Sequence, residues 1–335
     1  MRALVYSETG GPEVLRLVER PVPEPGPAEV RVRVAVSGVN PTDWKSRAGE
    51  GVAFPEVVPN QDGAGTIDAV GDGVPLDRLG ERVWLWEAAW QRANGTAQEY
   101  VVLPERQAVA LPEDASFDVG ASLGIPALTA HRCLTVSEPG PAQLTPGTLA
   151  GRSVLVAGGA GAVGHAAIQL ARWAGARVIA TVSNPEKVAL AAAAGADRVV
   201  DYRSEGAADE IREAAPEGVD IVVEVAPATN AQLDAAVLAP NGTVAVYAAE
   251  GGTRLEVSVR ELFLRNVTYA FVLVYTVPRE AKDRAVADVA AAVADGALPV
   301  GAEAGLPLHR FPLDQTAAAH AAVESGAVGK VLIDV

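Results

Sequence analysis

Three glycines at fixed spacing constrain the fold of this chain more than any other feature of its sequence. Gly159, Gly161 and Gly164 follow directly after the apolar run Val154–Ala157 and open a segment with helical periodicity. A strand, a tight glycine turn and a helix in that order let the backbone approach a phosphate group closely, and the first N–H groups of the helix then face it. The pattern predicts a site for a nucleotide phosphate; the alternative is a glycine-rich turn without a ligand.

The glycine turn lies in a long stretch where apolar runs alternate with helical segments. This alternation continues from Ser153 to Val274 and predicts βαβ units, hence an α/β fold with a doubly wound parallel sheet of the Rossmann type. The first ~120 residues differ, because short strand-like runs are separated by turn residues, as in a β-barrel or a partly open one. Since 335 residues are too many for one ordinary core, two domains are expected.

The end of the strand after the glycine turn indicates which dinucleotide is bound. A site for NAD usually has an acidic residue there for the ribose 2′-hydroxyl, and Glu186 comes too late for that position. Ser183 and Asn184 could instead bind a 2′-phosphate, Lys187 could pair with its charge, and Tyr202 could cap the adenine or the phosphate. The sequence therefore predicts NADPH. The alternatives are a solvated helix lysine at position 187 and a surface turn residue at position 202.

Charge and cysteine content exclude several classes of protein. The formal net charge is −15 and no basic run occurs, which argues against nucleic-acid or anionic-membrane partners. The one cysteine, Cys133, cannot form an intrachain disulfide, which is typical of the reducing cytoplasm. The N-terminal segment is predicted to be a strand and not a signal peptide, and no apolar run is long enough for a membrane span.

Short motifs spread over the whole chain point to a known family. They are MRALVYSETGGPEVL, GVNPTDWKSRAG, PNQDGAG, GERV, LGIPALTAHRCL, AGGAGAVGHAAIQLAR, VVDYR and VGKVLIDV. Taken together, these motifs resemble the medium-chain dehydrogenase/reductase superfamily, and within it the zinc-free quinone oxidoreductases of the zeta-crystallin type. The resemblance implies a GroES-like β-barrel catalytic domain at residues 1–124, completed by residues 275–335, and a Rossmann NADPH-binding domain at residues 125–274. It also implies a homodimer built through the Rossmann sheets.

The resemblance further implies an active site without metal. Zinc-dependent relatives take a Cys from the segment matching Val39–Asp43 and a His from the segment matching Pro59–Gly65, and neither segment of this chain contains Cys or His. Asp43 and Asp62 alone would make a poor zinc site.

Four residues are candidates for the chemistry at the nicotinamide. Asn40 matches the family asparagine that replaces the zinc cysteine, and Asp43 follows it in the family pattern. Lys45 could protonate a developing enolate, or pair with Asp43, or lie on the surface. Thr129 resembles a family threonine near the nicotinamide, and the alternative is a hydroxyl bonded to its own helix backbone.

Other cofactor contacts follow by position in the family pattern. They are Gly159, Ala160, Gly161, Ala162, Val163, Gly164, Ala226, Tyr247, Ala248, Phe271, Leu273 and Lys330. Of these, Phe271 and Leu273 could equally be dimer-interface or core residues.

Three functions remain open at this point. The leading hypothesis is an NADPH-dependent reductase that transfers hydride to a quinone or an α,β-unsaturated carbonyl compound. A second is a dedicated enoyl-thioester or biosynthetic tailoring reductase, since one fold serves many chemistries. A third is a non-catalytic, crystallin-like protein that binds nucleotide or RNA, although the negative charge disfavours RNA.

Overall fold

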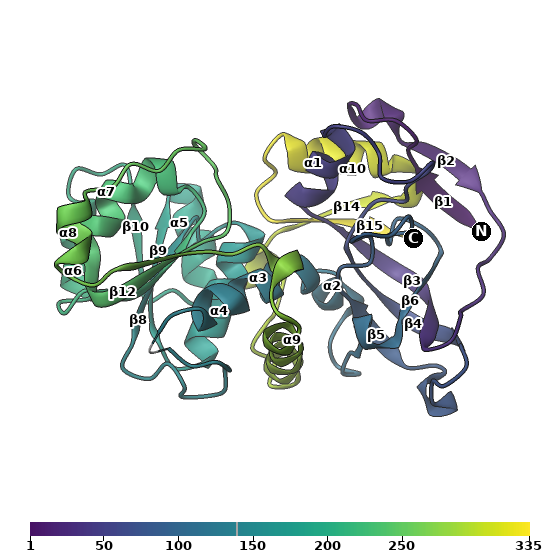
Figure 1. The fold of residues 1–335 in the computed structure, drawn as a ribbon, viewed down its shortest axis with the longest axis horizontal. Coiled ribbons are helices and arrows are strands. Elements are labelled where there is room, and N and C mark those ends of the chain that lie inside the picture. Colours follow the sequence, from purple (N-terminus) through teal and green to yellow (C-terminus); the bar gives the residue numbers. More distant parts are fainter. Residues whose placement is uncertain (139) are drawn as a thin grey trace. The chain divides into compact units, whose positions relative to one another are not determined.

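The computed structural model describes residues 1–138 and 140–335, which form two compact units (Figure 1). Unit 1 comprises Met1–Ile125 and Pro307–Val335, and unit 2 comprises Pro126–Leu306. The chain therefore returns to unit 1 at residue 307 and not at the expected 275. The reason lies in helix α9 (Arg279–Ala294), whose Asp288 carboxylate lies 2.7 Å from Nε2 of His131 and accepts a 2.7 Å hydrogen bond from the Leu144 amide, both in unit 2.

Unit 1 is built on a seven-stranded mixed sheet in the order β14-β15-β3-β4-β5-β7, with β6 also paired to β3. A separate antiparallel pair is formed by β1 and β2. The strands are β1 (Arg2–Val5), β2 (Arg16–Glu19), β3 (Glu29–Val39), β4 (Asp62–Val70), β5 (Arg82–Leu85), β6 (Tyr100–Pro104), β7 (Ala108–Ala110), β14 (Leu308–Pro312) and β15 (Lys330–Asp334). The helices are α1 (Pro41–Ala48), α2 (Phe117–Gly120), α10 (Thr316–Glu324) and the 3-10 turns η1 (Pro12–Val14), η2 (Leu76–Arg78), η3 (Glu105–Gln107) and η6 (Leu313–Gln315). The β-rich N-terminal half predicted from the sequence is confirmed.

The long strand β3 shows why this sheet forms. Valines alternate with charged residues along it, and Val30, Val32 and Val34 are buried while their neighbours face outward. Period-two alternation places one face of the strand on a core, here with residues of β4, β5 and β6. The C-terminal strand β15, yellow in Figure 1, pairs antiparallel with the end of β3, so that Leu332 lies opposite Gly38.

Unit 2 has a six-stranded sheet with every neighbouring pair parallel, in the order β10-β9-β8-β11-β12-β13. This is the doubly wound order of a dinucleotide-binding domain, as the sequence predicted. The strands are β8 (Ser153–Ala157), β9 (Arg177–Val182), β10 (Arg198–Asp201), β11 (Val219–Glu224), β12 (Leu238–Val246) and β13 (Thr268–Phe271). The helices are α3 (Gly124–Thr135, which begins in unit 1), α4 (Ala162–Trp173), α5 (Pro185–Ala193), α6 (Ala207–Ala214), α7 (Pro227–Val237), α8 (Val259–Phe263), α9 and the 3-10 turns η4 (Val274–Thr276) and η5 (Ala302–Ala304). Every helix among the described residues is too short or too polar to cross a bilayer.

Candidate active site

The glycine turn connects β8 to α4 in unit 2 and is anchored to the neighbouring strand. The amides of Gly158 and Gly159 both donate to the carbonyl of Thr181, at 3.0 and 3.1 Å. Gly158, which the sequence analysis did not select, has φ 70°, a conformation that favours glycine. A Cβ on Gly164 would lie 2.4 Å from the carbonyl oxygen of Gly158, so the helix approaches the turn as closely as it does only because position 164 is glycine.

The start of α4 is open for an anion. Its N-cap is Gly161, which is exposed and provides no capping side chain. Ala160 is buried beneath the turn, and Ala162, Val163 and Gly164 form the first helical turn. Because the first N–H groups of a helix have no partner within it, they can bind a phosphate. The residues present therefore fit a dinucleotide pyrophosphate.

Three residues predicted to recognise a 2′-phosphate converge at the carboxyl end of β9. Asn184 caps α5, its Oδ1 accepting from the amide of Lys187 at 2.9 Å. Because the helix begins at this cap, Lys187 lies one turn after Ser183. The Lys187 ammonium donates a hydrogen bond to the Ser183 hydroxyl at 3.2 Å. Ser183 and Lys187 are both partly exposed, so a cation and a hydroxyl group lie together at the surface of the unit.

Tyr202 follows the neighbouring strand at the same edge of the sheet. Its amide donates to the carbonyl of Val182 at 3.2 Å, directly before Ser183. The guanidinium of Arg203 lies 5.7 Å from the centre of the Tyr202 ring. Arg203 was missed in the sequence, although a cation two residues after a strand that ends at this edge is the signal that could have found it. It adds a second positive charge to the edge that carries Lys187.

A pocket of about 380 Å³ lies at the carboxyl ends of β12 and β13. Four predicted cofactor residues line it: Tyr247, Ala248, Phe271 and Leu273. Phe271 and Leu273 are 72% and 54% exposed, so neither is a core residue of the unit. The dimer-interface alternative for these two stays open.

Ala226, another predicted contact, lies at the start of α7 and is held by an acid that the sequence analysis missed. Glu224, the fully buried last residue of β11, accepts a hydrogen bond from the amide of Ala226 and others from Nδ2 of Asn230. Asp234 is also buried and bonds to Glu224. Burial raises the pKa of both carboxyls, and the negative charge of Glu224 raises that of Asp234 further.

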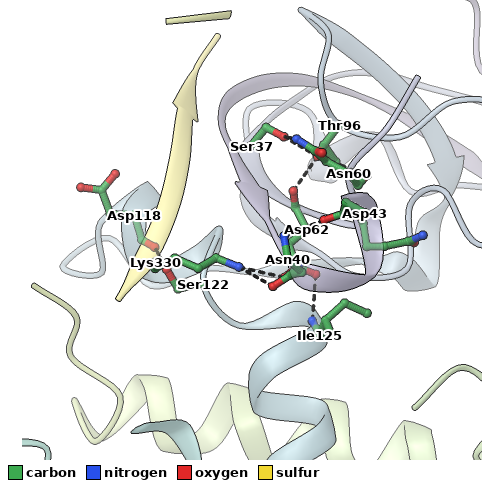
Figure 2. A network of polar contacts seen from close by, with 11 residues as sticks. Ser37, Asn40, Asp43, Asn60, Asp62, Thr96, Asp118, Ser122, Ile125 and Lys330 are labelled. Atoms are coloured by element: carbon green, nitrogen blue, oxygen red, sulfur yellow. Dashed lines mark hydrogen bonds and ion pairs between the residues drawn. The ribbon is translucent and has the colours of Figure 1, made fainter. Parts of the chain in front are cut away.

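In unit 1, a buried polar network surrounds Asn40 (Figure 2). Asn40 Oδ1 accepts from Nζ of Lys330 at 2.7 Å, and Asn40 Nδ2 donates to Oδ2 of Asp62 at 2.6 Å. Lys330 Nζ also lies 3.4 Å from Oδ2 of Asp62, and Asp62 Oδ1 accepts from the Ile125 amide at 2.8 Å. Both ends of the Asn40 carboxamide are thereby fixed in orientation.

Two glycines make this network possible. A Cβ on Gly38 would lie 3.1 Å from Cε of Lys330 and 2.1 Å from the carbonyl oxygen of Ala121, so glycine leaves room for the lysine stem to pass β3. A Cβ on Gly124 would lie 2.2 Å from Oδ1 of Asp62. Lys330, for which a contact with the cofactor stays a prediction, is buried with Asn40 and Asp62 as its partners within unit 1.

Asp43 has a structural position at the start of α1. Its Oδ2 accepts from the amide of Asn40 at 2.7 Å, and its Oδ1 accepts from the amide of Gln61 at 3.2 Å. The sequence Asn-Pro-x-Asp is a helix-start signal that could have predicted α1, which the sequence analysis left unassigned. Burial, and then the negative charge of Asp62, raise the pKa of Asp43 to about 8.

The two remaining catalytic candidates lie in different units. Lys45 is exposed on α1, with its ammonium 5.7 Å from the ring centre of Trp44, and both oxygens of Asp43 are already engaged by backbone amides. Thr129 is buried on α3 in unit 2. Its hydroxyl makes no hydrogen bond to any described residue, so the alternative of a hydroxyl bonded to its own helix is not seen.

The described residues contain no cluster of three His, Cys, Asp or Glu side chains with metal-binding geometry. Each histidine Nε2 has a protein partner: Asp288 for His131, Asn60 for His320, and main-chain carbonyls for His165 and His309. Burial lowers the pKa of His320 to about 3 and that of His165 to about 4, so both remain neutral at physiological pH.

Family models of known proteins match segments of both units. Residues 26–113 match the family model of the alcohol dehydrogenase GroES-like domain, and residues 162–291 match that of zinc-binding dehydrogenases. Human quinone oxidoreductase is 31% identical over 341 residues, covering 99% of this chain and 97% of the relative.

Solved structures extend the likeness to the whole fold. A mycobacterial protein solved in complex with NADPH is 32% identical with a TM-score of 0.81, and an NAD-dependent alcohol dehydrogenase is 30% identical with a TM-score of 0.85. In both cases 100% of each chain is covered. The predicted GroES-like and Rossmann fold class is thus confirmed, and the chain belongs to the quinone oxidoreductase family of the medium-chain dehydrogenases/reductases.

Proposed function

We propose that this chain is an NADPH-dependent reductase that transfers hydride to a quinone or an α,β-unsaturated carbonyl compound without zinc. The observation that carries the proposal is the cluster of Ser183, Asn184 and Lys187 beside the glycine turn. An acidic residue at the end of β9 would repel a 2′-phosphate, whereas these side chains offer a cation and hydrogen-bond donors to it. The NADPH found with the mycobacterial relative supports the same choice.

In this proposal, one set of residues binds the cofactor and another set orients and stabilises the acceptor. The turn Gly159–Gly164 would hold the pyrophosphate, and the pocket with Tyr247 and Phe271 would receive the nicotinamide end. When bound, the nicotinamide supplies hydride chemistry, so the protein needs no nucleophile of its own. What the chain must add is orientation and stabilisation of negative charge on the acceptor oxygen.

We assign that second task to hydrogen-bond donors of the predicted catalytic set. The Asn40 amide is held rigid by Asp62 and Lys330, which keeps its orientation constant from one turnover to the next. The Thr129 hydroxyl has no partner among the described residues and can donate to a ligand. Lys45 is exposed and able to exchange protons with water, so it can supply the proton that an enolate takes up.

The absence of zinc is part of the proposal. The segments that hold metal in zinc-dependent relatives here contribute Asn40 and Asp62, and the ammonium of Lys330 binds both. A cation already bound to these groups competes with a metal for them. Activity that survives exhaustive chelation, in protein free of stoichiometric zinc, would agree with this; loss of activity that zinc restores would contradict it.

We also propose a homodimer in a reducing cytoplasm. β13 is the edge strand of the unit 2 sheet, and Phe263 and Val259 of α8 are 59% and 74% exposed. An unpaired edge beside exposed apolar side chains favours association with a second copy. Analytical ultracentrifugation tests the dimer, and a monomer at micromolar concentration would contradict it.

The central test is cofactor selectivity during turnover. Oxidation of NADPH and of NADH is followed with phenanthrenequinone and with a simple enone as acceptors. Lys187→Ala should raise KM for NADPH about 10- to 100-fold, the range expected for a lost hydrogen bond to a charged group, and leave KM for NADH unchanged. The matched control is Arg198→Ala, an exposed cation at the opposite, amino end of β10. Equal use of NADH by the wild type, or turnover of no acceptor despite tight NADPH binding, would refute the proposal.

A further inference from the structure

The pocket at the ends of β12 and β13 carries one charged side chain. Its walls are mostly apolar, formed in part by Val246, Leu255, Phe271 and Leu273. Among the residues lining it, Arg254 is the one with a cationic side chain, and no Asp or Glu lines it. A volume of about 380 Å³ is within the range of pockets that bind small molecules. The combination of apolar walls and one cation describes a site for an apolar molecule with one anionic group.

Arg254 is available to a ligand. It makes no hydrogen bond or ion pair with any residue that the structure describes. By contrast, Arg212 and Arg265, which line the larger hollow beside α7 and α8, each donate to main-chain carbonyls. Glu250 and Glu256 occur in the same loop as Arg254, but neither lines the pocket. A guanidinium offers a planar pair of donors that matches a carboxylate.

The order of strands separates Arg254 from the sites that fit the cofactor phosphates. The cluster with Lys187 lies at β9, next to the edge strand β10, and the glycine turn lies at the end of β8. β12 is two strands beyond β8 in the sheet, and β13 is three. With neighbouring strands about 4.8 Å apart, the ends of β12 and β13 lie roughly 10–14 Å from the pyrophosphate turn. A dinucleotide that extends along the strand ends from β9 past β8 thus places its nicotinamide in this pocket. The acceptor must bind beside the nicotinamide, so it must lie at the same pocket.

We propose that Arg254 determines acceptor specificity by binding a carboxylate on the acceptor. The acceptor class is then an apolar quinone or enone that carries one acidic group. A coenzyme A thioester, which carries several phosphates, would need several cations, and this pocket provides one. The inference rests on the proposed reductase function and adds the substrate class to it.

The test compares two acceptors with the same enone, 6-oxohept-4-enoic acid and its methyl ester, with NADPH as donor; the methylene groups between the double bond and the carboxyl group keep the reactivity of the enone alike in both. For the wild type, kcat/KM should be about tenfold higher for the acid, the lower end of the range for a hydrogen-bonded charge because Arg254 is exposed. Arg254→Gln should remove this preference by lowering kcat/KM for the acid alone. Arg260→Gln, which changes an exposed arginine of α8 outside the pocket, should keep it.

Three results would overturn the inference, and they are distinguishable. Equal efficiency of the wild type on both acceptors would remove the specificity claim and leave the reductase function intact. A rise in KM for NADPH in Arg254→Gln, alike with acid and ester, would assign Arg254 to the cofactor. Reduction of neither compound, nor of any quinone, by protein that binds NADPH would refute the reductase function itself.

Discussion

Replacing Lys330 by methionine tests the buried charges around Asn40. The Lys330 ammonium is buried 2.7 Å from Oδ1 of Asn40 and 3.4 Å from Oδ2 of Asp62. Methionine keeps most of the volume of the stem and removes the charge. The Asp62 carboxylate then loses the only cation that the described part of the chain places within salt-bridge distance of it.

The expected cost follows from the contacts that remain. Removal of one partner from a buried ion pair typically costs about 3–5 kcal/mol. Asp62 keeps two donors, Nδ2 of Asn40 at 2.6 Å and the amide of Ile125 at 2.8 Å, and it can also take up a proton. We therefore expect the free energy of unfolding to fall by about 3 kcal/mol, at the lower end of this range.

The loss should depend on pH with a definite sign. Burial raises the pKa of Asp62 in the folded chain, and removal of the Lys330 charge, which lowers that pKa, should raise it further. A carboxyl whose folded pKa exceeds its unfolded value of about 4 stabilises the fold only at low pH, and this contribution is lost as pH rises to the folded pKa. The variant should thus be closest to wild type near about pH 5 and least stable, relative to it, near about pH 8.

Urea unfolding of wild type, Lys330→Met and Lys330→Met/Asp62→Asn at the two pH values provides the measurement. The double variant carries no buried charge from this pair, so it should be more stable than the single variant at high pH. A pH-independent loss of less than about 1 kcal/mol in Lys330→Met, with no recovery in the double variant, would refute the account of this network.

Three further predictions concern other parts of the chain. Because the pKa of Asp43 is raised to about 8, wild-type stability should fall as pH rises from about 4 to about 8, and Asp43→Asn should flatten that slope in urea unfolding; an unchanged slope would contradict this. Cys133 is fully buried and burial raises the pKa of its thiol, so Ellman's reagent should modify it at the rate of unfolding and not at that of an exposed thiol. Gly164→Ala places a Cβ 2.4 Å from the Gly158 carbonyl oxygen, so NADPH titrations should show a Kd raised about tenfold or more; an unaltered Kd would argue against phosphate binding at this turn.

Much of unit 2 follows from local sequence. The glycine spacing, the alternation of strands and helices, and the position of Lys187 one helical turn after Ser183 all depend on residues within a few positions of one another. Helical geometry brings residues i and i+4 together without help from the rest of the chain. The alternation of strands and helices, the glycine turn and the proximity of Lys187 to Ser183 were therefore predictable.

Contacts between distant segments of the chain were decided only by the tertiary structure. Lys330 meets Asn40 across 290 positions because β15 pairs with β3, and Glu224 meets Asp234 because α7 folds back beside β11. The membership of α9 in unit 2 depends on Asp288 reaching His131. No local pattern marks such partners, since burial and pairing of a charge are set by the packing around it. The sequence by itself determined the glycine turn between β8 and α4, whereas the tertiary structure decided which buried charges hold Asn40.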